Sequence, residues 1–267
     1  MSLPAYLTAL DLSALPTDYP WDTTISNRFW AANDEDNPRL IKALLLIDVK
    51  PAFALGVACA EWVAARVAGQ VDTADALLRI EAAWAATADL RYANLPSPPS
   101  NPPSAPYQFA GPLRLAMRFL SYSSELFHGT GKDVRSNTQA LAMLVEHIAG
   151  RHPAFSPWLS DALRRAHDHF ARSDVGVENE PPVPKELFEP DFVWRDGVGR
   201  ESLDRFIRTL DPSRNPYLRP GDEMRAAGFP VTVGAGAPGS ASARVQNVMQ
   251  VTPTADYAQS NDRSKPR

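Results

Sequence analysis

The segment from residue 51 to residue 68 constrains the fold more than any other part of the chain. Pro51 is a favourable first residue of a helix, and Gly69 is a favourable stop. At about 100° per residue, apolar side chains fall on both sides of this helix, with Phe53 on one side and Trp62 on the other. A helix that is apolar nearly all round must be covered on every side, so we predict that it is the central helix.

The remaining pattern also favours helices. Asp22 and Asn37 are good N-cap residues, and Pro38 suits the first position of a helix. Alternation of apolar and polar residues is almost absent, and FPVTV near residue 230 is the only run typical of a strand. We therefore predict an all-α, irregular multi-helix bundle. Its helices cover about residues 22–30, 38–48, 51–68, 72–92, 111–128, 136–149, 156–170 and 203–210, with a last turn or two within 215–229.

Two segments of unusual composition divide the chain. PSPPSNPPSAP, within residues 95–109, is too rich in proline for a helix or a central strand and is predicted to be an extended crossover. A linker between two domains is the alternative, but the helices before it are too apolar to be solvated on their outer side. Small and polar residues dominate after Pro230, so we predict an α-helical domain over 1–228 and a disordered tail over 229–267.

Charge and cysteine content exclude several classes of protein. The net charge of -4 and the pI near 5.8, without a cluster of Lys and Arg, argue against a nucleic-acid partner. No window reaches the roughly 20 apolar residues of a membrane span. The single cysteine, Cys59, lies in an apolar stretch and is expected to be a small buried side chain. These features favour a cytoplasmic protein.

One glycine pattern resembles a dinucleotide-binding loop but lacks its context. Gly234, Gly236 and Gly239 form a literal G-x-G-x-x-G after FPVTV. Such a loop needs a following helix that packs on a parallel sheet, whereas this chain continues as a polar tail. Pro238 also removes a backbone donor that the loop would offer to phosphate. We therefore predict no cofactor.

Metal and catalytic motifs are incomplete. Glu125 and His128 form an E-x-x-H pair, but a helical di-metal site needs a second such pair and further glutamates. His167 and His169 project about 200° apart on a helix and cannot share an ion. No serine or cysteine has the surroundings of a nucleophile. The sequence thus predicts no metal ligands and no catalytic residues.

Two glutamates stand on apolar helix faces. Glu61 and Glu81 are each flanked by apolar residues at helical spacing, and an isolated buried charge there is too costly unless it is paired or protonated. The polar stripe of the helix after Gly111 offers Arg114 and Arg118 as partners. We predict a buried polar network of these four residues that fixes how the helices pack, in preference to a substrate site.

The acidic run Asp34, Glu35 and Asp36 lies in a loop between two helices. Such a run is usually a solvated turn, and its functional interpretation is an electrostatic surface for a basic partner. Trp21 and Trp194 lie in irregular segments and are candidate anchors for a partner protein.

The function expected from these observations is a non-catalytic helical protein-binding module, of the adaptor or toxin-neutralising type. An alternative is a metal-binding or enzymatic bundle that uses the interior carboxylates together with Glu125 and His128. A third is a structural homo-oligomer, in which the apolar excess of the central helices is buried between subunits. The first is preferred because catalytic signatures are missing, and an enzyme is less favoured than a binding protein.

Overall fold

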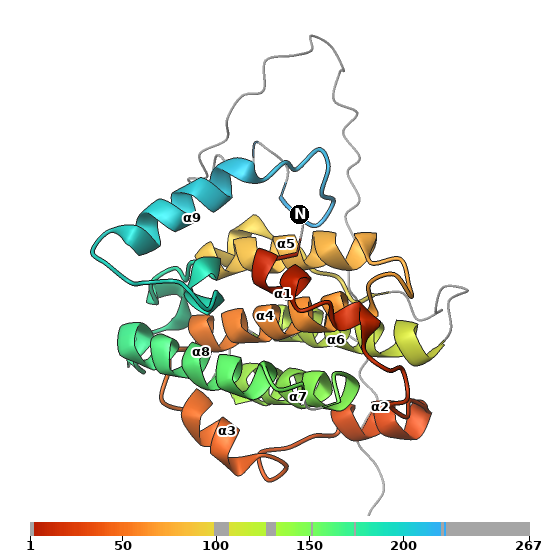
Figure 1. Ribbon diagram of the computed structural model, residues 1–267. Helices are drawn as coiled ribbons and strands as arrows, with labels where there is room; N and C mark the ends of the chain where they lie inside the picture. Colours follow the sequence, from red (N-terminus) through yellow and green to blue (C-terminus); the bar gives the residue numbers. More distant parts are fainter. Residues whose placement is uncertain are drawn as a thin grey trace, which may run out of the picture. The chain divides into compact units, whose positions relative to one another are not determined.

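The computed structural model describes residues 3–98, 107–126, 132–150, 152–173, 175–219 and 222. Over these ranges the chain forms α-helices, short 3₁₀-helices and no β-strand (Figure 1), which confirms the predicted all-α multi-helix bundle. The α-helices are α1 (Ala5–Ala9), α2 (Thr23–Trp30), α3 (Pro38–Leu44), α4 (Val49–Val67), α5 (Ala74–Ala88), α6 (Tyr107–Glu125), α7 (Lys132–Ile148), α8 (Phe155–Phe170) and α9 (Val198–Thr209). The 3₁₀-helices are η1 (Leu12–Ala14), η2 (Leu90–Tyr92), η3 (Val177–Asn179) and η4 (Lys185–Phe188).

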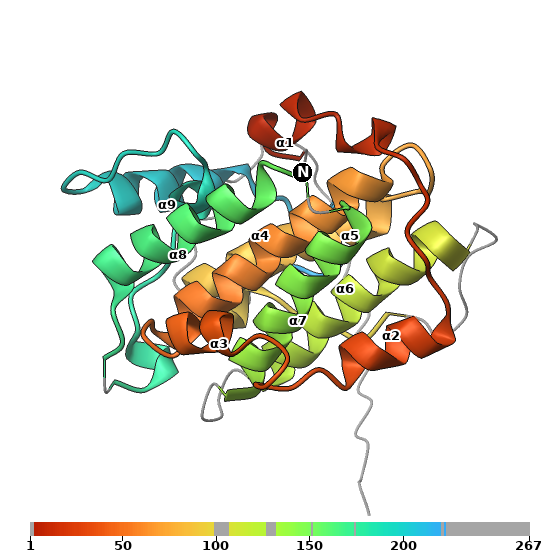
Figure 2. The ribbon, with the colours of Figure 1, turned by 60° about the horizontal axis from the view of Figure 1, so that its bottom comes forward.

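Helix α4 is the central helix, as its apolar pattern predicts. Every residue of α4 is buried, and the helix packs against α5, α6, α7 and α8 (Figure 2). Its small residues allow a close approach to α7. A Cβ atom added at Gly56 would lie 2.9 Å from Oγ1 of Thr138. The helix therefore forms the centre of the core, and the neighbouring helices pack against its different sides.

Local capping explains where three helices begin. Oδ1 of Asp22 accepts a hydrogen bond from the backbone N–H of Ile25 at 2.8 Å, and Oδ1 of Asn37 accepts from Leu40 at 3.2 Å. Both caps confirm the prediction from sequence. Helix α5 begins one residue later than Asp72 suggests, although that carboxylate still accepts from the N–H of Ala74 at 2.9 Å.

A distant residue caps α4. The helix begins at Val49, two residues before the predicted start, and the Glu180 side chain accepts from the N–H groups of Val49 at 2.9 Å and Lys50 at 2.6 Å. Because Glu180 is far from α4 in the sequence, local capping rules do not reveal this contact. The carboxylate satisfies donors that every helix leaves open at its first turn.

Other helix bounds also differ from the prediction. Helix α3 ends at Leu44 instead of residue 48, α7 begins at Lys132 instead of residue 136, and α9 begins at Val198 instead of residue 203. Helix α6 begins at Tyr107, inside the predicted 95–109 crossover, and accommodates Pro112 within the helix. The part of that crossover at 99–106 lies outside the described residues. Helix α5 ends at Ala88 instead of residue 92, because Asp89 has an extended backbone and its carboxylate accepts the N–H of Arg91 at 2.9 Å.

The segment that follows α9 is not a helix over residues 215–219, in contrast to the predicted last turns. Leu218 forms an antiparallel bridge with Ala93, and Asn94 donates to the carbonyl of Tyr217 at 2.8 Å. Pairing with the segment after η2 satisfies backbone groups that a helical turn would otherwise satisfy. The predicted tail over 229–267, FPVTV and the glycine pattern lie outside the described residues.

Buried arginines hold loops against the helices. The guanidinium of Arg66 donates to the carbonyls of Ile148 at 2.8 Å and Pro16 at 2.7 Å. Similarly, Arg135 donates to the carbonyls of Leu44, at the end of α3, and of Ile47, just before α4. Arg165 donates to the carbonyl of Leu187 at 2.7 Å. Each of these guanidinium groups is tied to backbone oxygens of another segment, so it fixes the path of a loop that sequence periodicity leaves open.

Candidate functional site

The acidic run forms an ordered turn between α2 and α3. Oδ2 of Asp36 accepts the N–H of Asn33 at 2.8 Å, and Oδ1 of Asn33 accepts the N–H of Glu35 at 2.8 Å. Ser136 of α7 donates to Oδ1 of Asp34 at 2.9 Å. The turn is thus fixed on α7, while Glu35 and Asp36 are exposed.

A pocket of about 570 Å³ lies beside this turn, between α2 and α7. We call it the acidic-rim pocket. Its volume lies within the usual range of ligand pockets in proteins. Its lining combines apolar and charged side chains: Arg28, Phe29, Ala32, Asp36, Met143, Glu146, His147 and Gly150.

Aromatic packing fixes the floor of the acidic-rim pocket. The ring centroid of His147 lies 5.4 Å from that of Phe29 and 6.1 Å from those of Tyr19 and Trp21. Nε2 of His147 is 2.8 Å from the carbonyl oxygen of Pro20, so this nitrogen carries a proton and donates. The rings hold one another in place, and the floor is therefore preorganised.

Carboxylates outnumber cations around this pocket. Asp36 and Glu146 both line it, and among the described residues of the lining Arg28 is the only cation. Within the part of the chain that the structure describes, the Glu146 side chain makes no hydrogen bond or ion pair. An aromatic floor below a carboxylate rim suits the apolar stem and charged end of a Lys or Arg side chain.

The two tryptophans predicted as anchors pack inside the fold. Trp21 stacks on Phe29 with centroids 6.0 Å apart, and a Cβ atom at Gly111 would lie 2.0 Å from its Nε1. Trp194 stacks on His169 at 4.3 Å. Both are partly accessible and pack against the core, so their role as anchors for a partner stays a prediction.

A different tryptophan is exposed. The Trp30 side chain at the end of α2 is 40% exposed, and the Arg118 guanidinium carbon lies 4.2 Å from its ring centroid. Tyr122, which is 41% exposed, lies 5.7 Å from Trp30 between centroids. The sequence gives no signal for this surface, because Trp30 stands in an amphipathic helix where an aromatic residue is expected to face the core.

Glu61 is deeply buried, as its position on an apolar face predicts. Its side chain is in contact with α5, where Nε1 of Trp84 donates to Oε1 at 2.9 Å. Burial raises the pKa of Glu61 to about 8, although the Trp84 hydrogen bond and the charge of Lys185 act in the opposite direction. The carboxyl group borders a cavity of about 10 Å³ that Tyr6 and Lys185 also line, which is room for about one water molecule.

The four residues of the predicted polar network, Glu61, Glu81, Arg114 and Arg118, do not all share the same partners. Glu61 interacts with Trp84, whereas Arg118 lies over Trp30, so these two residues have different partners. Glu81 is half-buried and accepts a hydrogen bond from Nδ2 of Asn215 at 2.8 Å. A link between Glu81 and Arg114 stays a prediction.

Metal ligation has no support in the described ranges. No three His, Cys, Asp or Glu side chains group there in a way that would hold an ion. Cys59 is fully buried, and burial raises the pKa of its thiol. Glu125 is the last residue of α6, and His128 lies outside the described residues.

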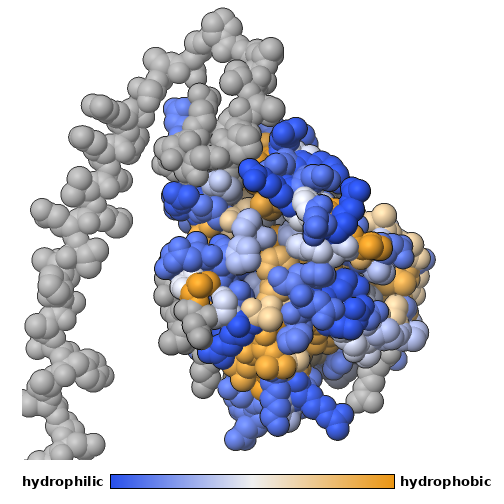
Figure 3. All heavy atoms as spheres, turned by 90° about the vertical axis from the view of Figure 1, so that its left-hand side faces the viewer, coloured by the Kyte–Doolittle hydropathy of each residue, from blue (hydrophilic) through white to orange (hydrophobic). Residues whose placement is uncertain are grey.

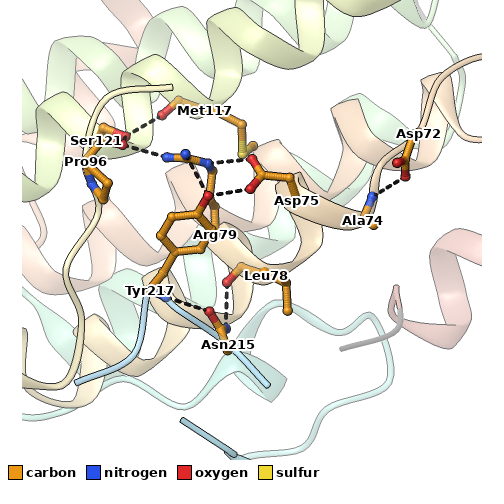
Figure 4. Close-up of polar contacts among 10 residues, drawn as sticks. All are labelled: Asp72, Ala74, Asp75, Leu78, Arg79, Pro96, Met117, Ser121, Asn215 and Tyr217. Atoms are coloured by element: carbon orange, nitrogen blue, oxygen red, sulfur yellow. Dashed lines mark hydrogen bonds and ion pairs between the residues drawn. The ribbon is translucent and has the colours of Figure 1, made fainter. Parts of the chain in front are cut away.

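Sequence reasoning missed a polar cluster on α5. The buried Arg79 donates to Oδ2 of Asp75 at 2.8 Å, to the carbonyl of Pro96 at 2.6 Å and to the Tyr217 hydroxyl at 2.8 Å (Figure 4). Tyr217 in turn donates to Asp75. The Asp75–Arg79 spacing of four residues is a common helix pair and gives no indication of the distant tyrosine.

Among the helices that the structure describes, none is both long and apolar enough to cross a membrane. The chain was compared with known protein families, with curated proteins and with solved structures, and none of the three comparisons found a match.

Proposed function

We propose that this protein is a non-catalytic protein-binding module, and that the acidic-rim pocket receives a Lys or Arg side chain of its partner. One observation carries the proposal. The exposed carboxylates of Glu35 and Asp36 stand on a rigid turn next to a pocket whose floor is formed by Phe29 and His147.

This arrangement has the two properties of an interface anchor. A preformed pocket with an aromatic floor gives a partner side chain apolar contact at little cost in conformational entropy. The surrounding carboxylates attract a basic surface over a distance and select against an acidic one. Trp30, on the same helix as Phe29, is 40% exposed and offers a further aromatic side chain for the contact.

The experiment compares three forms of the full chain as bait in extracts of the native cell. The first is the wild type, and the second carries Asp36→Lys and Glu146→Lys. The control carries Asp191→Lys and Asp196→Lys, which change the charge equally at two exposed aspartates outside the pocket. Quantitative mass spectrometry identifies what each form captures.

We expect a protein that the wild type and the control capture and that the pocket variant loses by at least about tenfold. Binding of that purified protein should weaken as salt rises, since exposed charges are screened. If no captured protein distinguishes the pocket variant from the control, the proposal is wrong.

An enzymatic or metal-binding bundle is the second candidate, and the raised pKa of Glu61 is the observation that favours it. The adjoining cavity of about 10 Å³ is too small for an organic substrate, so catalysis there would require a protonated carboxyl group acting on water or an ion. Metal analysis of the purified protein tests it. Stoichiometric iron, manganese or zinc would support this candidate over the binding module.

A structural homo-oligomer is the third candidate. Leu45 and Leu46, between α3 and α4, are 39% and 58% exposed, and Val175 is 48% exposed. Figure 3 shows apolar residues gathered on the face that it displays. Light scattering tests this candidate, and a mass that falls to that of the single chain in Leu46→Lys would support it.

A further inference from the structure

The carboxylates that line the acidic-rim pocket have oxygens to which no group of the described chain donates. Glu146 of α7 makes no hydrogen bond or ion pair within the described ranges, so both of its carboxylate oxygens can accept from a ligand. Asp36 lines the pocket from the turn before α3. In the same ranges only its Oδ2 accepts a hydrogen bond, from the N–H of Asn33, which leaves Oδ1 to a ligand.

The floor of the pocket supplies a further acceptor. Nε2 of His147 donates to the carbonyl oxygen of Pro20, so in the neutral ring Nδ1 has a lone pair and can accept. No donor to Nδ1 is present in the part of the chain that the structure describes. The acceptors of the pocket thus come from α7 and from the turn before α3.

The rings of the floor are fixed by one another. Phe29 is stacked on Trp21 with ring planes 15° apart, and the His147 ring meets Phe29 edge-on at 61°. In close packing of this kind, one ring cannot turn without displacing the next. The floor therefore offers flat ring surface in a fixed position, which suits a planar cation because such a cation can stack on a ring.

We propose that the basic side chain received by the acidic-rim pocket is an arginine of a partner protein, an inference that rests on the proposed function. The planar guanidinium group lies against the floor of Phe29 and His147. It donates to the carboxylates of Glu146 and Asp36. The methylene groups of the arginine contact Met143, in the apolar part of the lining.

The number of donors and the strength of hydration favour arginine over lysine. A guanidinium group has five N–H donors in one plane, enough for a bidentate pair with Glu146 and for a further acceptor. An ammonium group has three donors on one atom and is more strongly hydrated, so its transfer from water to the pocket costs more free energy. Arg28, which also lines the pocket, repels both cations and does not distinguish them.

The first experiment measures how the full chain binds three peptides of five residues. Each is acetylated and amidated, with glycine and alanine around a central arginine, lysine or citrulline, and citrulline has nearly the shape of arginine without its charge. Titrations up to about 10 mM are followed by backbone amide shifts in NMR spectra. We expect saturable shifts at Phe29, Glu146 and Gly150 with the arginine peptide, and at least about fivefold weaker binding of the other two.

The outcomes separate this inference from the proposed function. Equal binding of the arginine and lysine peptides would overturn the choice of arginine and leave a pocket for basic side chains in place. If the citrulline peptide binds as well as the arginine peptide, the charge does not matter, and both proposals are overturned. If no peptide shifts the pocket resonances, the inference is overturned, and the capture experiment alone decides the proposed function.

The second experiment locates the groups that select arginine. Glu146→Gln keeps the size of the side chain and removes its charge, so the arginine peptide should bind at least about fivefold more weakly. Its preference over the lysine peptide should also fall, which loss of stability alone would not cause. Asp196→Asn, at an exposed aspartate outside the pocket, is the matched control and should change neither affinity nor preference.

The fold of the Glu146→Gln protein is checked by its melting temperature. Because the Glu146 side chain is partly exposed and makes no hydrogen bond within the described ranges, we expect this temperature to stay that of the wild type. An unchanged preference for arginine in Glu146→Gln would show that another group selects the guanidinium, and would overturn the proposal.

Discussion

The buried carboxyl group of Glu61 shows how the protein interior affects the ionisation of a side chain. Its carboxyl group lies in the middle of α4 and has the indole N–H of Trp84 as its hydrogen-bond partner. In the buried site an ionised carboxylate loses the favourable free energy of hydration that it has in water. The Trp84 hydrogen bond and the charge of Lys185 replace only part of that free energy. The protonated form is therefore favoured in the folded state at neutral pH.

This residue makes stability depend on pH. Because the pKa of Glu61 is higher in the folded state than in the unfolded chain, the folded state binds more protons between the ordinary glutamate range and about pH 8. The free energy of unfolding should consequently fall as pH rises through that range, by on the order of 1 kcal/mol per pH unit. Glu61→Gln, which keeps an acceptor for Trp84, should remove this slope.

Urea denaturation of both proteins at several pH values between about 5 and 8 measures the effect. Glu35→Gln, at an exposed glutamate, is the matched control and should keep the wild-type slope. Parallel profiles for the wild type and Glu61→Gln would contradict the buried, protonated state of this residue.

At the scale of single elements, contacts from distant segments decide how helices begin and pack. The first turn of α4 has its donors satisfied by Glu180, which is 4% exposed. Helix α6 keeps a glycine, Gly111, where the Trp21 ring lies against its backbone. Each contact joins residues that are far apart in the chain, and each has a measurable energetic consequence.

Removal of the Glu180 carboxylate should destabilise the fold. Glu180→Ala leaves the N–H groups of Val49 and Lys50 without their acceptor in a buried place, which is expected to cost about 2–4 kcal/mol. The matched control is Glu178→Ala, at an exposed glutamate two residues earlier. Chemical denaturation checks both, and equal stability of the two variants would show that Glu180 does not cap α4.

A methyl group at position 111 should disturb the contact between α6 and Trp21. In Gly111→Ala the new Cβ would lie 2.0 Å from Nε1 of Trp21, so the ring must move, at a cost of about 1–3 kcal/mol. In a Trp21→Ala background the same substitution should be neutral or stabilising, since alanine favours helices by up to about 1 kcal/mol. Thermal denaturation of the four proteins tests the pair, and an equal effect of Gly111→Ala in both backgrounds would rule out the clash.

At the scale of the whole molecule, the segment after α9 packs against α5 and is the last part of the chain with buried residues in the described ranges. Asn215 and Leu218 are buried, and Tyr217 joins Asp75 and Arg79 of α5. Small and polar residues dominate the composition after Pro230, which lies outside the described residues. The boundary of the stable unit is thus predicted to follow residue 219.

Two truncations test this boundary. A chain that ends at residue 228 should keep the melting temperature of the full chain to within about 2 °C. A chain that ends at residue 210 loses the contacts of Asn215, Tyr217 and Leu218 and should melt at least about 5 °C lower. Equal melting temperatures of the two truncated chains would show that the segment after α9 contributes nothing to stability.

Much of the helical architecture follows from local chemistry. The caps at Asp22 and Asn37, the all-round apolar character of α4 and the burial of Glu61 are visible in the sequence, because each depends on neighbours within one or two helical turns. The candidate sites are less predictable. The acidic run is visible as a charge pattern, but its position beside Phe29 and His147 is not.

The sequence by itself determined that this chain forms helices around one apolar rod and that it lacks complete motifs for common chemistry. Only the tertiary structure decided that Glu180 caps α4, that Arg79 meets Tyr217, and that charged side chains from α5, η4 and the turn after α9 line one pocket. The physical reason is the distance along the sequence over which each interaction acts. Helix propensity and capping act within a few residues, whereas these contacts depend on how a chain with many loops returns to the same place, which no local pattern specifies.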